Sequence, residues 1–90
     1  MKNLTQLLKA LANEKRLLIL KYLIRADRST LEEISQEINL SYKSTSKHLL
    51  ILEREGYLER NTQGARVFYS IPHFKTDDPH IQLLRMIKET

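Results

Sequence analysis

Cysteine is absent from this chain of 90 residues, and glycine and proline each occur only twice. Without cysteine there is no disulfide, no thiolate metal site and no thiol redox chemistry. With two glycines there is no glycine-rich loop to hold a phosphate group, and no nucleophile, base and oxyanion donors are assembled in the sequence. We therefore expect that the protein is not an enzyme and uses no cofactor.

Long apolar runs are missing as well. The longest, at residues 17–24, is too short to span a bilayer and includes Lys21. The first leucines recur with helical spacing and do not form the unbroken apolar stretch of a signal peptide. We therefore expect a cytoplasmic protein with no membrane partner. The hydrophobic share of 41% suits one small domain, residues 1–90, and the net charge of +4 suits a polyanionic partner.

The stretch that ends at Gly56 has the features of a helix with one basic face, at residues 41–55. Ser41 suits its N-cap, and Gly56 suits the left-handed residue after its last turn. At 100° per residue, Leu49 and Leu52 fall on one side, and most of the basic side chains fall on the other. An ordinary solvated helix surface is the alternative. The side chains expected to contact phosphates or base edges of double-stranded DNA are Ser41, Tyr42, Lys43, Ser44, Ser46, Lys47 and Arg54.

The residues before this helix predict three more helices. Leucines spaced by three and four residues indicate an amphipathic helix over residues 3–12, and a nearly continuous apolar pattern indicates a central core helix over residues 14–25. Thr30 and Glu33 form a capping box that begins the next helix. A two-residue turn joins that helix to the basic one. Two helices in this order, the second of them basic, predict a helix-turn-helix at residues 31–55.

After the basic helix the pattern becomes strand-like. Residues 57–62 and 66–71 predict two strands, the second rich in β-branched and aromatic side chains, and Gly64 can supply the positive φ of a tight turn between them. A hairpin directly after a helix-turn-helix is a wing, here residues 57–71. An arginine on a wing can enter a minor groove, but whether Arg66 points outward depends on the register of the hairpin. The DNA contacts expected from the wing are Arg60, Gln63 and Arg66.

A last helix is expected at residues 78–89, where Asp78 and Pro79 suit its N-cap and first turn. Its apolar stripe and that of residues 3–12 either cover the domain's own core or form a two-fold dimer interface. We favour the dimer, because helix-turn-helix proteins usually pair to read two half-sites. The side chains expected in the interface are Leu4, Leu7, Leu8, Ile81, Leu84 and Ile87. The expected fold is mainly α with a small β-hairpin, a winged helix-turn-helix of order α-α-α-α-β-β-α.

Elements in this order resemble the ArsR-type winged helix-turn-helix transcriptional repressors over residues 4–89. Residues 11–20 are similar to the family's LA(D/N)xxRLxIL opening, and residues 41–52 are similar to its LSxSxxSxHLxxL recognition helix. Residues 56–58, together with Gly64 and the strand that follows, resemble its wing. The resemblance implies a homodimer that binds a palindromic operator as a repressor and releases it on sensing a metal or another signal.

The sequence departs from the metal-sensing members of that family. Their Cys-x-Cys near the third helix has no counterpart around residues 29–33, where cysteine is absent. A second family site on the last helix begins with Asp-x-His, which Asp78 and His80 resemble, but its partner histidine would fall beyond Thr90. Because a tetrahedral zinc site needs four ligands, Asp78 and His80 make half a site, and a helix cap is their alternative role. We expect no metal.

We therefore predict a sequence-specific DNA-binding regulator of transcription that acts as a homodimeric repressor. The alternative is a winged-helix adaptor that binds another protein and not DNA. No effector pocket is evident, so we expect no effector, with a sensor of a non-metal ligand as the alternative. Tyr42 can stack on the DNA or pack on the third helix, and Leu50 can contact a thymine methyl or be an ordinary surface residue. We expect His48 to be packed and hydrogen-bonded.

Overall fold

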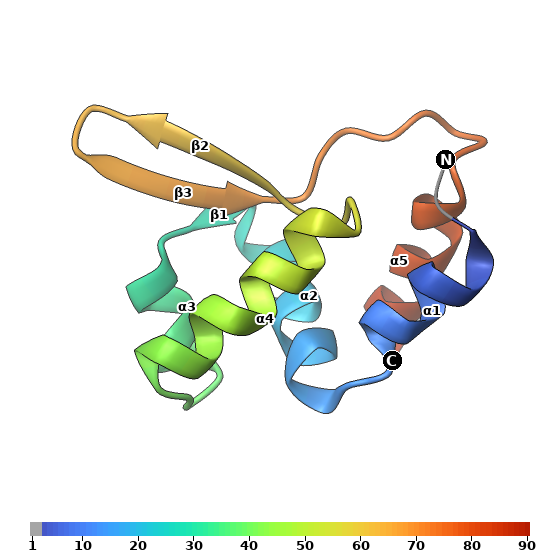
Figure 1. Ribbon diagram of the computed structural model, residues 1–90. Coiled ribbons are helices and arrows are strands. Elements are labelled where there is room, and N and C mark those ends of the chain that lie inside the picture. Colours follow the sequence, from blue (N-terminus) through green and yellow to red (C-terminus); the bar gives the residue numbers. More distant parts are fainter. Residues whose placement is uncertain (1–2) are drawn as a thin grey trace.

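The computed structural model describes residues 3–90, so Met1 and Lys2 of the predicted domain 1–90 lie outside the described residues. Its elements are α1 (Leu4–Leu11), α2 (Glu14–Ala26), β1 (Arg28–Ser29), α3 (Leu31–Glu37), α4 (Tyr42–Arg54), β2 (Glu59–Gln63), β3 (Arg66–Ser70) and α5 (Pro79–Glu89). Figure 1 shows the hairpin of β2 and β3 projecting above α3 and α4, with α1 and α5 on the opposite side. This is the predicted winged helix-turn-helix.

A short strand, β1, was missing from the predicted order. Arg28 pairs with Ser70 and Ser29 pairs with Tyr69, so that β1 and β3 run antiparallel and the sheet has the order β1-β3-β2. The element order is therefore α-α-β-α-α-β-β-α. Two residues are too few to display the alternation that identifies a strand, and only their pairing with distant β3 defines them. β1 ties the base of the wing to the loop between α2 and α3.

Side-chain caps begin the two helices of the helix-turn-helix, as predicted. Thr30 Oγ1 accepts a hydrogen bond from the backbone N–H of Glu33 at 3.2 Å, and Glu33 Oε1 accepts one from the N–H of Thr30 at 2.8 Å. The bonds from Thr30 hold the pKa of the Glu33 carboxyl below its usual range. At the start of α4, the Ser41 hydroxyl accepts a bond from the N–H of Ser44 at 3.1 Å. Both caps satisfy N–H groups that have no partner within the helix.

α2 lies in the middle of the core, but one of its sides is open. Ile19, Leu20 and Leu23 are at most 1% exposed, whereas Leu17 and Leu18 are 37% and 39% exposed. The prediction that α2 is buried nearly all round is therefore only partly correct. The buried hydrophobic side chains from the other elements are Leu7, Ala10, Leu31, Ile34, Ile38, Leu49, Leu52, Tyr57, Leu58, Tyr69, Leu84 and Ile87.

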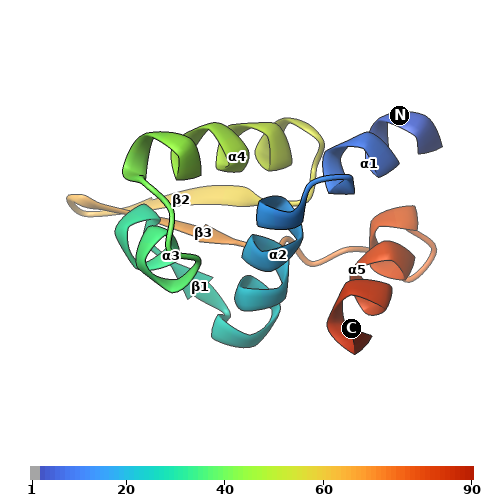
Figure 2. The same ribbon diagram turned by 90° about the horizontal axis from the view of Figure 1, so that it is seen from below.

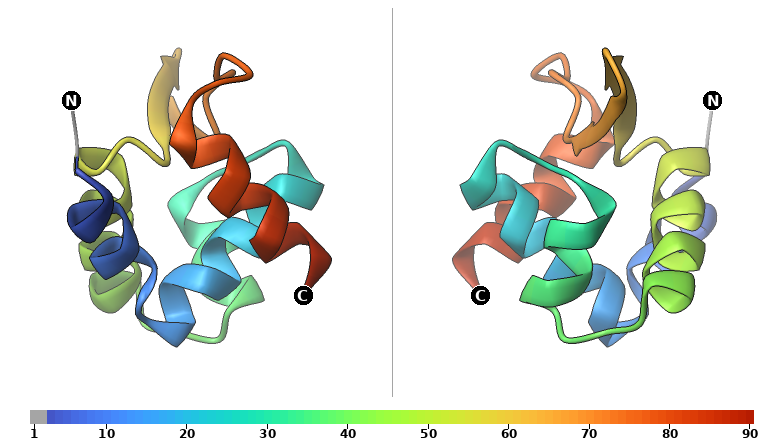
Figure 3. Two further views of the ribbon diagram at one scale, coloured as in Figure 1. Left: turned by 90° about the vertical axis from the view of Figure 1, so that its right-hand side faces the viewer. Right: turned by 90° about the vertical axis from the view of Figure 1, so that its left-hand side faces the viewer.

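The molecule has two distinct ends. Seen from below, the amino end of α4 and the tip of the hairpin lie at the same end of the molecule, away from α5 (Figure 2). The two views of Figure 3 show these ends directly, with α1 and α5 facing the viewer on the left and α3, α4 and the hairpin on the right. The helix-turn-helix and the wing therefore share one end, and the terminal helices share the other.

Candidate nucleic-acid interface

α4 is held against the core by its inner face. Leu49 and Leu52 are 1% and 0% exposed, and Thr45 is fully buried. The Thr45 hydroxyl donates a hydrogen bond to the backbone carbonyl of Ser41 at 2.8 Å, so its polar atom is satisfied inside the core. Rotation of α4 about its axis would expose these side chains to water, at a cost of about 2 kcal/mol for each leucine. The opposite face is therefore fixed toward solvent.

The outer face of α4 is polar and accessible. Tyr42 is 59% exposed and so is not buried against α3, and Leu50 is 53% exposed. The predicted DNA contacts on α4 and its cap that are exposed are Ser41, Tyr42, Lys43, Ser46, Lys47 and Arg54, whereas Ser44 is half-buried. Among residues 3–90, ion pairs join Arg25 to Glu37 and His80 to Asp78, and none uses a basic side chain of α4. Its lysines and arginine are available to an external anion.

His48 lies between α4 and α2, packed and hydrogen-bonded as predicted. Arg16 Nη1 lies 3.3 Å from His48 Nδ1. Since a guanidinium has only donors, Nδ1 must be the acceptor and carries no proton. Burial, followed by the positive charges of Arg16 and Lys15, lowers the pKa of the His48 ring. His48 therefore belongs to the contact between α2 and α4 and not to the outer face of α4.

The register of the hairpin decides where the wing side chains point. Arg60 pairs with Tyr69, and Gln63 pairs with Arg66. Tyr69 is only 8% exposed, so its face of the hairpin, which Arg60 shares, is turned toward the helices. Because side chains alternate along a strand, Arg66 lies on the other face with Phe68. Arg66 therefore shares the face of β3 opposite Tyr69 and is exposed to solvent, a placement that the sequence alone left undecided.

A basic residue that the sequence analysis did not single out joins the wing. The guanidinium carbon of Arg28 lies 4.2 Å from the ring centre of Phe68, and Arg28 Nη1 donates a hydrogen bond to Gln63 Oε1 at 3.0 Å. The guanidinium of Arg66 lies 5.1 Å from the centre of the same ring. Two cations thus gather at one aromatic ring on the wing. The sequence carried no signal for this cluster, because Arg28 reaches the wing only through the unpredicted strand β1.

A groove of about 450 Å³ joins α4 to the wing. It lies between the amino ends of α3 and α4 and the hairpin. Tyr42 and Ser46 line it from α4, Arg60 and Arg66 line it from the wing, and Glu32 contributes an acidic side chain from α3. The helix and the wing therefore form one polar surface, rich in donors, at the end of the molecule that Figure 2 shows on the left.

Asp78 and His80 form hydrogen bonds within the protein at the carboxyl end of α4. His80 Nδ1 lies 2.6 Å from Asp78 Oδ1, and His80 Nε2 lies 2.9 Å from the backbone oxygen of Glu55. The bonds from the backbone N–H and then the ring of His80 lower the pKa of the Asp78 carboxyl. Gly56 has a φ of +84°, and a Cβ on it would lie 3.1 Å from His80 Nε2. The pair therefore caps α5 and ties it to α4 with both ring nitrogens engaged.

The residues predicted for a dimer interface differ in their burial and fall into three groups. Those already buried in the chain's own core are Leu7, Leu84 and Ile87, at 1%, 8% and 6% exposure. With these three, the terminal helices cover the chain's own core, which is the alternative that the sequence left open, and little of their surface remains for a partner. Ile81 is half-buried. Leu4 and Leu8 are 61% and 46% exposed and can meet a second chain.

An exposed apolar surface nevertheless exists at this end of the molecule. A groove of about 410 Å³ lies between α1, α2 and α5 and is lined mainly by apolar side chains. Four exposed apolar residues line it, and together with Leu4, one helical turn before Leu8 on α1, they form a surface that we call the apolar end: Leu4, Leu8, Leu17, Leu18 and Met86. The last three were not predicted, because the apolar pattern of α2 indicated a core helix and the residues expected in the interface from α5 were Ile81, Leu84 and Ile87. The described part of the chain has no helix long and apolar enough to cross a membrane. The same residues contain no cluster of three or more His, Asp or Glu that could hold a metal ion.

Comparison with known proteins gives a family and several related structures. The model of a family described as winged helix-turn-helix DNA-binding matches residues 13–59. The chain is 40% identical over 65 residues to the transcriptional activator HlyU of Vibrio cholerae, an alignment that spans 72% of this chain and 59% of that protein. The matched segment thus covers less than two thirds of this relative.

Two solved structures share both fold and sequence similarity with the chain. The transcriptional repressor PagR of Bacillus anthracis superposes with a TM-score of 0.77 at 29% identity, over 94% of this chain and 88% of that one. The homodimeric winged helix-turn-helix DNA-binding domain of Mb0332 from Mycobacterium bovis, a possible ArsR-family regulator, gives 0.75 at 26% identity, over 92% and 69%. The chain belongs to the winged helix-turn-helix DNA-binding family and, within that family, resembles ArsR-type regulators.

Proposed function

We propose that the protein is a homodimeric regulator of transcription that binds double-stranded DNA through α4 and the wing and represses its target genes. The observation that carries the proposal is the outer face of α4, which is exposed and basic while its inner face is locked into the core. Repression is the sign implied by the ArsR resemblance and by the name of the repressor PagR. A promoter fused to a reporter gene, with and without the protein, tests that sign, because the relative HlyU is named an activator.

In the proposed complex, α4 lies in the major groove. That groove is about 12 Å wide and admits one helix. Lys43 and Lys47 contact phosphates or base edges, and the hydroxyl groups of Ser46 and Tyr42 add hydrogen bonds from the groove between α4 and the wing. Lys43 and Lys47 are four residues apart, so they lie on the same side of the helix. The contacts release counterions from the DNA, and affinity therefore falls steeply with salt.

The wing and the second subunit complete the proposed interface. Arg28 and Arg66, gathered at the Phe68 ring, contact the DNA backbone or a narrow minor groove beside the site of α4. We propose that the apolar end forms the dimer interface, and two α4 helices of such a dimer must lie about 34 Å apart to match one helical turn of DNA. The exposure of Leu8 and Met86 supports this choice of interface, because a two-fold axis there leaves the wing free.

The decisive experiment removes the two α4 lysines. We expect Lys43→Ala combined with Lys47→Ala to weaken operator binding about 30-fold or more and to lower the slope of log affinity against log salt by about 2. Sequences selected from random duplex DNA by the purified protein supply the operator. Fluorescence anisotropy at several salt concentrations then measures the affinity and the slope.

The matched control is Lys9→Ala combined with Lys75→Ala, which removes two exposed charges outside the interface. Both double variants should keep the thermal unfolding midpoint of the parent protein. If the Lys43 and Lys47 variant binds the operator as the parent does, the proposed role of α4 is wrong. If the parent protein shows no salt-dependent binding to mixed duplex DNA even at low salt, the domain is instead an adaptor for another protein.

A further inference from the structure

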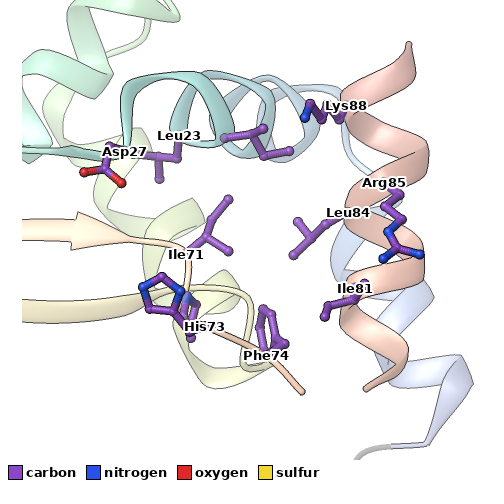
Figure 4. A pocket seen from close by; sticks show the side chains of 11 residues that line it. Leu23, Asp27, Ile71, His73, Phe74, Ile81, Leu84, Arg85 and Lys88 are labelled. Carbon is purple, nitrogen blue, oxygen red and sulfur yellow. The ribbon is translucent and has the colours of Figure 1, made fainter. Parts of the chain in front are cut away.

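A solvent-open cavity of about 380 Å³ lies between α2, α5 and the segment that links β3 to α5. The close view in Figure 4 shows side chains from all three elements around it. Its volume falls in the lower part of the range in which proteins bind small organic molecules. It is remote from the outer face of α4, and the sequence predicted no such pocket because its walls come from three separate segments of the chain.

The cavity has an apolar floor and a charged rim. Leu23 and Leu84 form the buried floor, and Ile71, Phe74 and Ile81 form half-buried walls. The rim residues are exposed and include Arg85 and Lys88 from α5, His73 from the linking segment and Asp27 at the end of α2. Among residues 3–90, no ion pair involves Arg85 or Lys88.

The charged side chains are distributed unevenly around the rim of the cavity. Arg85 and Lys88 place two cations on the α5 side. Asp27 is at the carboxyl end of α2, where the helix dipole is also negative. An anion is therefore attracted to the α5 side and repelled from the α2 side. Between them lies apolar surface on which an uncharged hydrocarbon body gains by leaving water.

The cavity remains open in the proposed dimer. It is lined from α5 by Ile81, Leu84, Arg85 and Lys88, whereas the groove of the apolar end is lined from α5 by Leu83, Met86, Ile87 and Thr90. At 100° per residue these two sets lie on nearly opposite sides of the helix. A second chain seated on the apolar end therefore leaves the cavity accessible.

We propose that this cavity binds a small amphipathic organic anion, a carboxylate with an aliphatic or aromatic body, and that the ligand regulates the protein. The carboxylate lies at Arg85 and Lys88, and the apolar body fills the space between Leu84, Ile71 and Phe74. Two cationic side chains around a hydrophobic floor suit this class of ligand better than a neutral lipid or a sugar, because each charge then acquires a partner.

A line of direct contacts leads from the cavity to the recognition helix. Phe74, in the cavity wall, is stacked on His80 with ring centres 4.8 Å apart and planes 3° from parallel. His80 Nε2 in turn contacts the backbone oxygen of Glu55, at the end of α4. A ligand that shifts Phe74 therefore moves a side chain that fixes the carboxyl end of α4. This regulatory step rests on the proposed DNA-binding function, whereas the ligand site itself does not.

Isothermal titration calorimetry of the intact protein with octanoate tests the site. Octanol and acetate serve as matched probes, the first with the chain but no charge and the second with the charge but no chain. We expect saturable binding of one octanoate per chain, about tenfold weaker binding of octanol and none of acetate. Arg85→Gln combined with Lys88→Gln should weaken octanoate about tenfold and leave octanol unchanged.

Two further variants control this result. Lys9→Gln combined with Lys75→Gln removes two charges outside the cavity and should leave octanoate binding unchanged. Ile81→Trp fills the cavity and should abolish binding of both octanoate and octanol, with circular dichroism used to verify the fold. Equal octanoate affinity in the parent protein and the Arg85 and Lys88 variant would overturn the proposal, as would the absence of saturable binding up to about 5 mM.

Operator binding, measured with and without saturating octanoate, tests the regulatory step. We expect the DNA affinity to change about fivefold or more, and the change to vanish in Ile81→Trp. By thermodynamic reciprocity, operator DNA must change octanoate affinity by the same factor. Bound octanoate with an unchanged DNA affinity would overturn regulation. A parent protein that binds octanoate but no DNA would refute the proposed function and leave the ligand site standing.

Discussion

The two ends of the molecule cover the same small core but differ in the side chains that they expose to solvent. At the end formed by α4 and the wing, most outward side chains are polar, and the exposed apolar ones are the isolated Leu50 and Val67. At the other end, Leu8 and Met86 are 46% and 65% exposed on the terminal helices. A 90-residue chain cannot bury every amphipathic helix on all its apolar sides. The end formed by α4 and the wing therefore presents a polar surface that suits water or an anion, whereas the apolar end suits contact with another protein surface.

This difference indicates which kind of substitution each end tolerates. A negative charge at the apolar end opposes contact with a second copy of the chain, whereas a negative charge on α4 opposes contact with a polyanion. The core between the ends is shared, so its variants should change stability and leave the specificity of both ends unaltered.

The largest expected effect comes from charging the apolar end. Leu8→Glu combined with Met86→Glu should convert the dimer to a monomer, because two carboxylates from each chain would be buried at the interface. Affinity for a palindromic operator should then fall about 100-fold, since the two half-sites are no longer bound together. Light scattering measures the mass, and anisotropy measures the affinity.

A matched change on the other end sharpens this test. Leu50→Glu places the same charge on the outer face of α4, where Leu50 is 53% exposed. It should leave the dimer mass unchanged and weaken operator binding through repulsion by the phosphates. If both variants stay dimeric, the apolar end is not the interface. If Leu50→Glu alone dissociates the dimer, the assignment of the two ends must be reversed.

The next largest effect is expected at Tyr57, which connects the two ends of the molecule through a hydrogen bond to α1. Tyr57 is fully buried and its hydroxyl donates a hydrogen bond to the backbone oxygen of Leu7 in α1 at 3.0 Å. Burial, with a smaller contribution from Glu55, raises the pKa of Tyr57 to about 12, so the hydroxyl remains a donor. Tyr57→Phe should lower the free energy of unfolding by about 1–2 kcal/mol. Urea unfolding measures this loss, and an unchanged midpoint would show that the bond contributes nothing.

A smaller effect is expected on the wing. Arg28→Ala should weaken operator binding about threefold to tenfold and reduce the salt slope by about 1, because one phosphate contact is lost. Arg28→Lys, which retains the charge, should recover the slope but not the full affinity, since lysine lacks the planar fork that stacks on Phe68. Loss of affinity without any change of slope would mean that Arg28 only supports the hairpin.

The smallest effect is the pH dependence that His48 contributes. Its pKa is lowered in the folded protein from the ordinary value of 6.5, so the unfolded chain binds the proton more tightly. The stabilising contribution is therefore complete above about pH 6.5 and declines as the pH falls toward the lowered value. His48→Gln keeps an acceptor for Arg16 and should reduce the loss of stability between about pH 7.5 and pH 5.5. Urea midpoints at the two pH values give the comparison, and an identical decline in both proteins would exclude His48 as its source.

Much of the helix-turn-helix end could be predicted from the sequence. Its signals are local: the Thr30 and Glu33 capping box, the Ser41 cap and the spacing of Leu49 and Leu52 all act within one or two helical turns. The predicted DNA contacts on α4 are accordingly found on its outer face, with Ser44 half-buried. Their role in binding DNA remains a prediction.

The wing and the terminal helices were harder to predict. The direction of Arg66 depends on hairpin register, which the pairing of Gln63 with Arg66 establishes. Arg28 reaches the wing only because β1 pairs with β3, a contact between distant parts of the chain. For α5, the apolar stripe is broad, and the sequence alone could not tell which side faces the chain's own core.

The sequence by itself determined the helices, their caps, the turn chemistry of Gly56 and Gly64, and the exclusion of thiolate chemistry. These features depend on residue type and on interactions between residues that lie close together in the sequence. Only the tertiary structure decided that Leu84 and Ile87 belong to the core, that Arg28 joins Phe68 and that a cavity is lined by both α2 and α5. Each of these outcomes depends on which distant segments meet, because burial and cavity shape are properties of the packed whole.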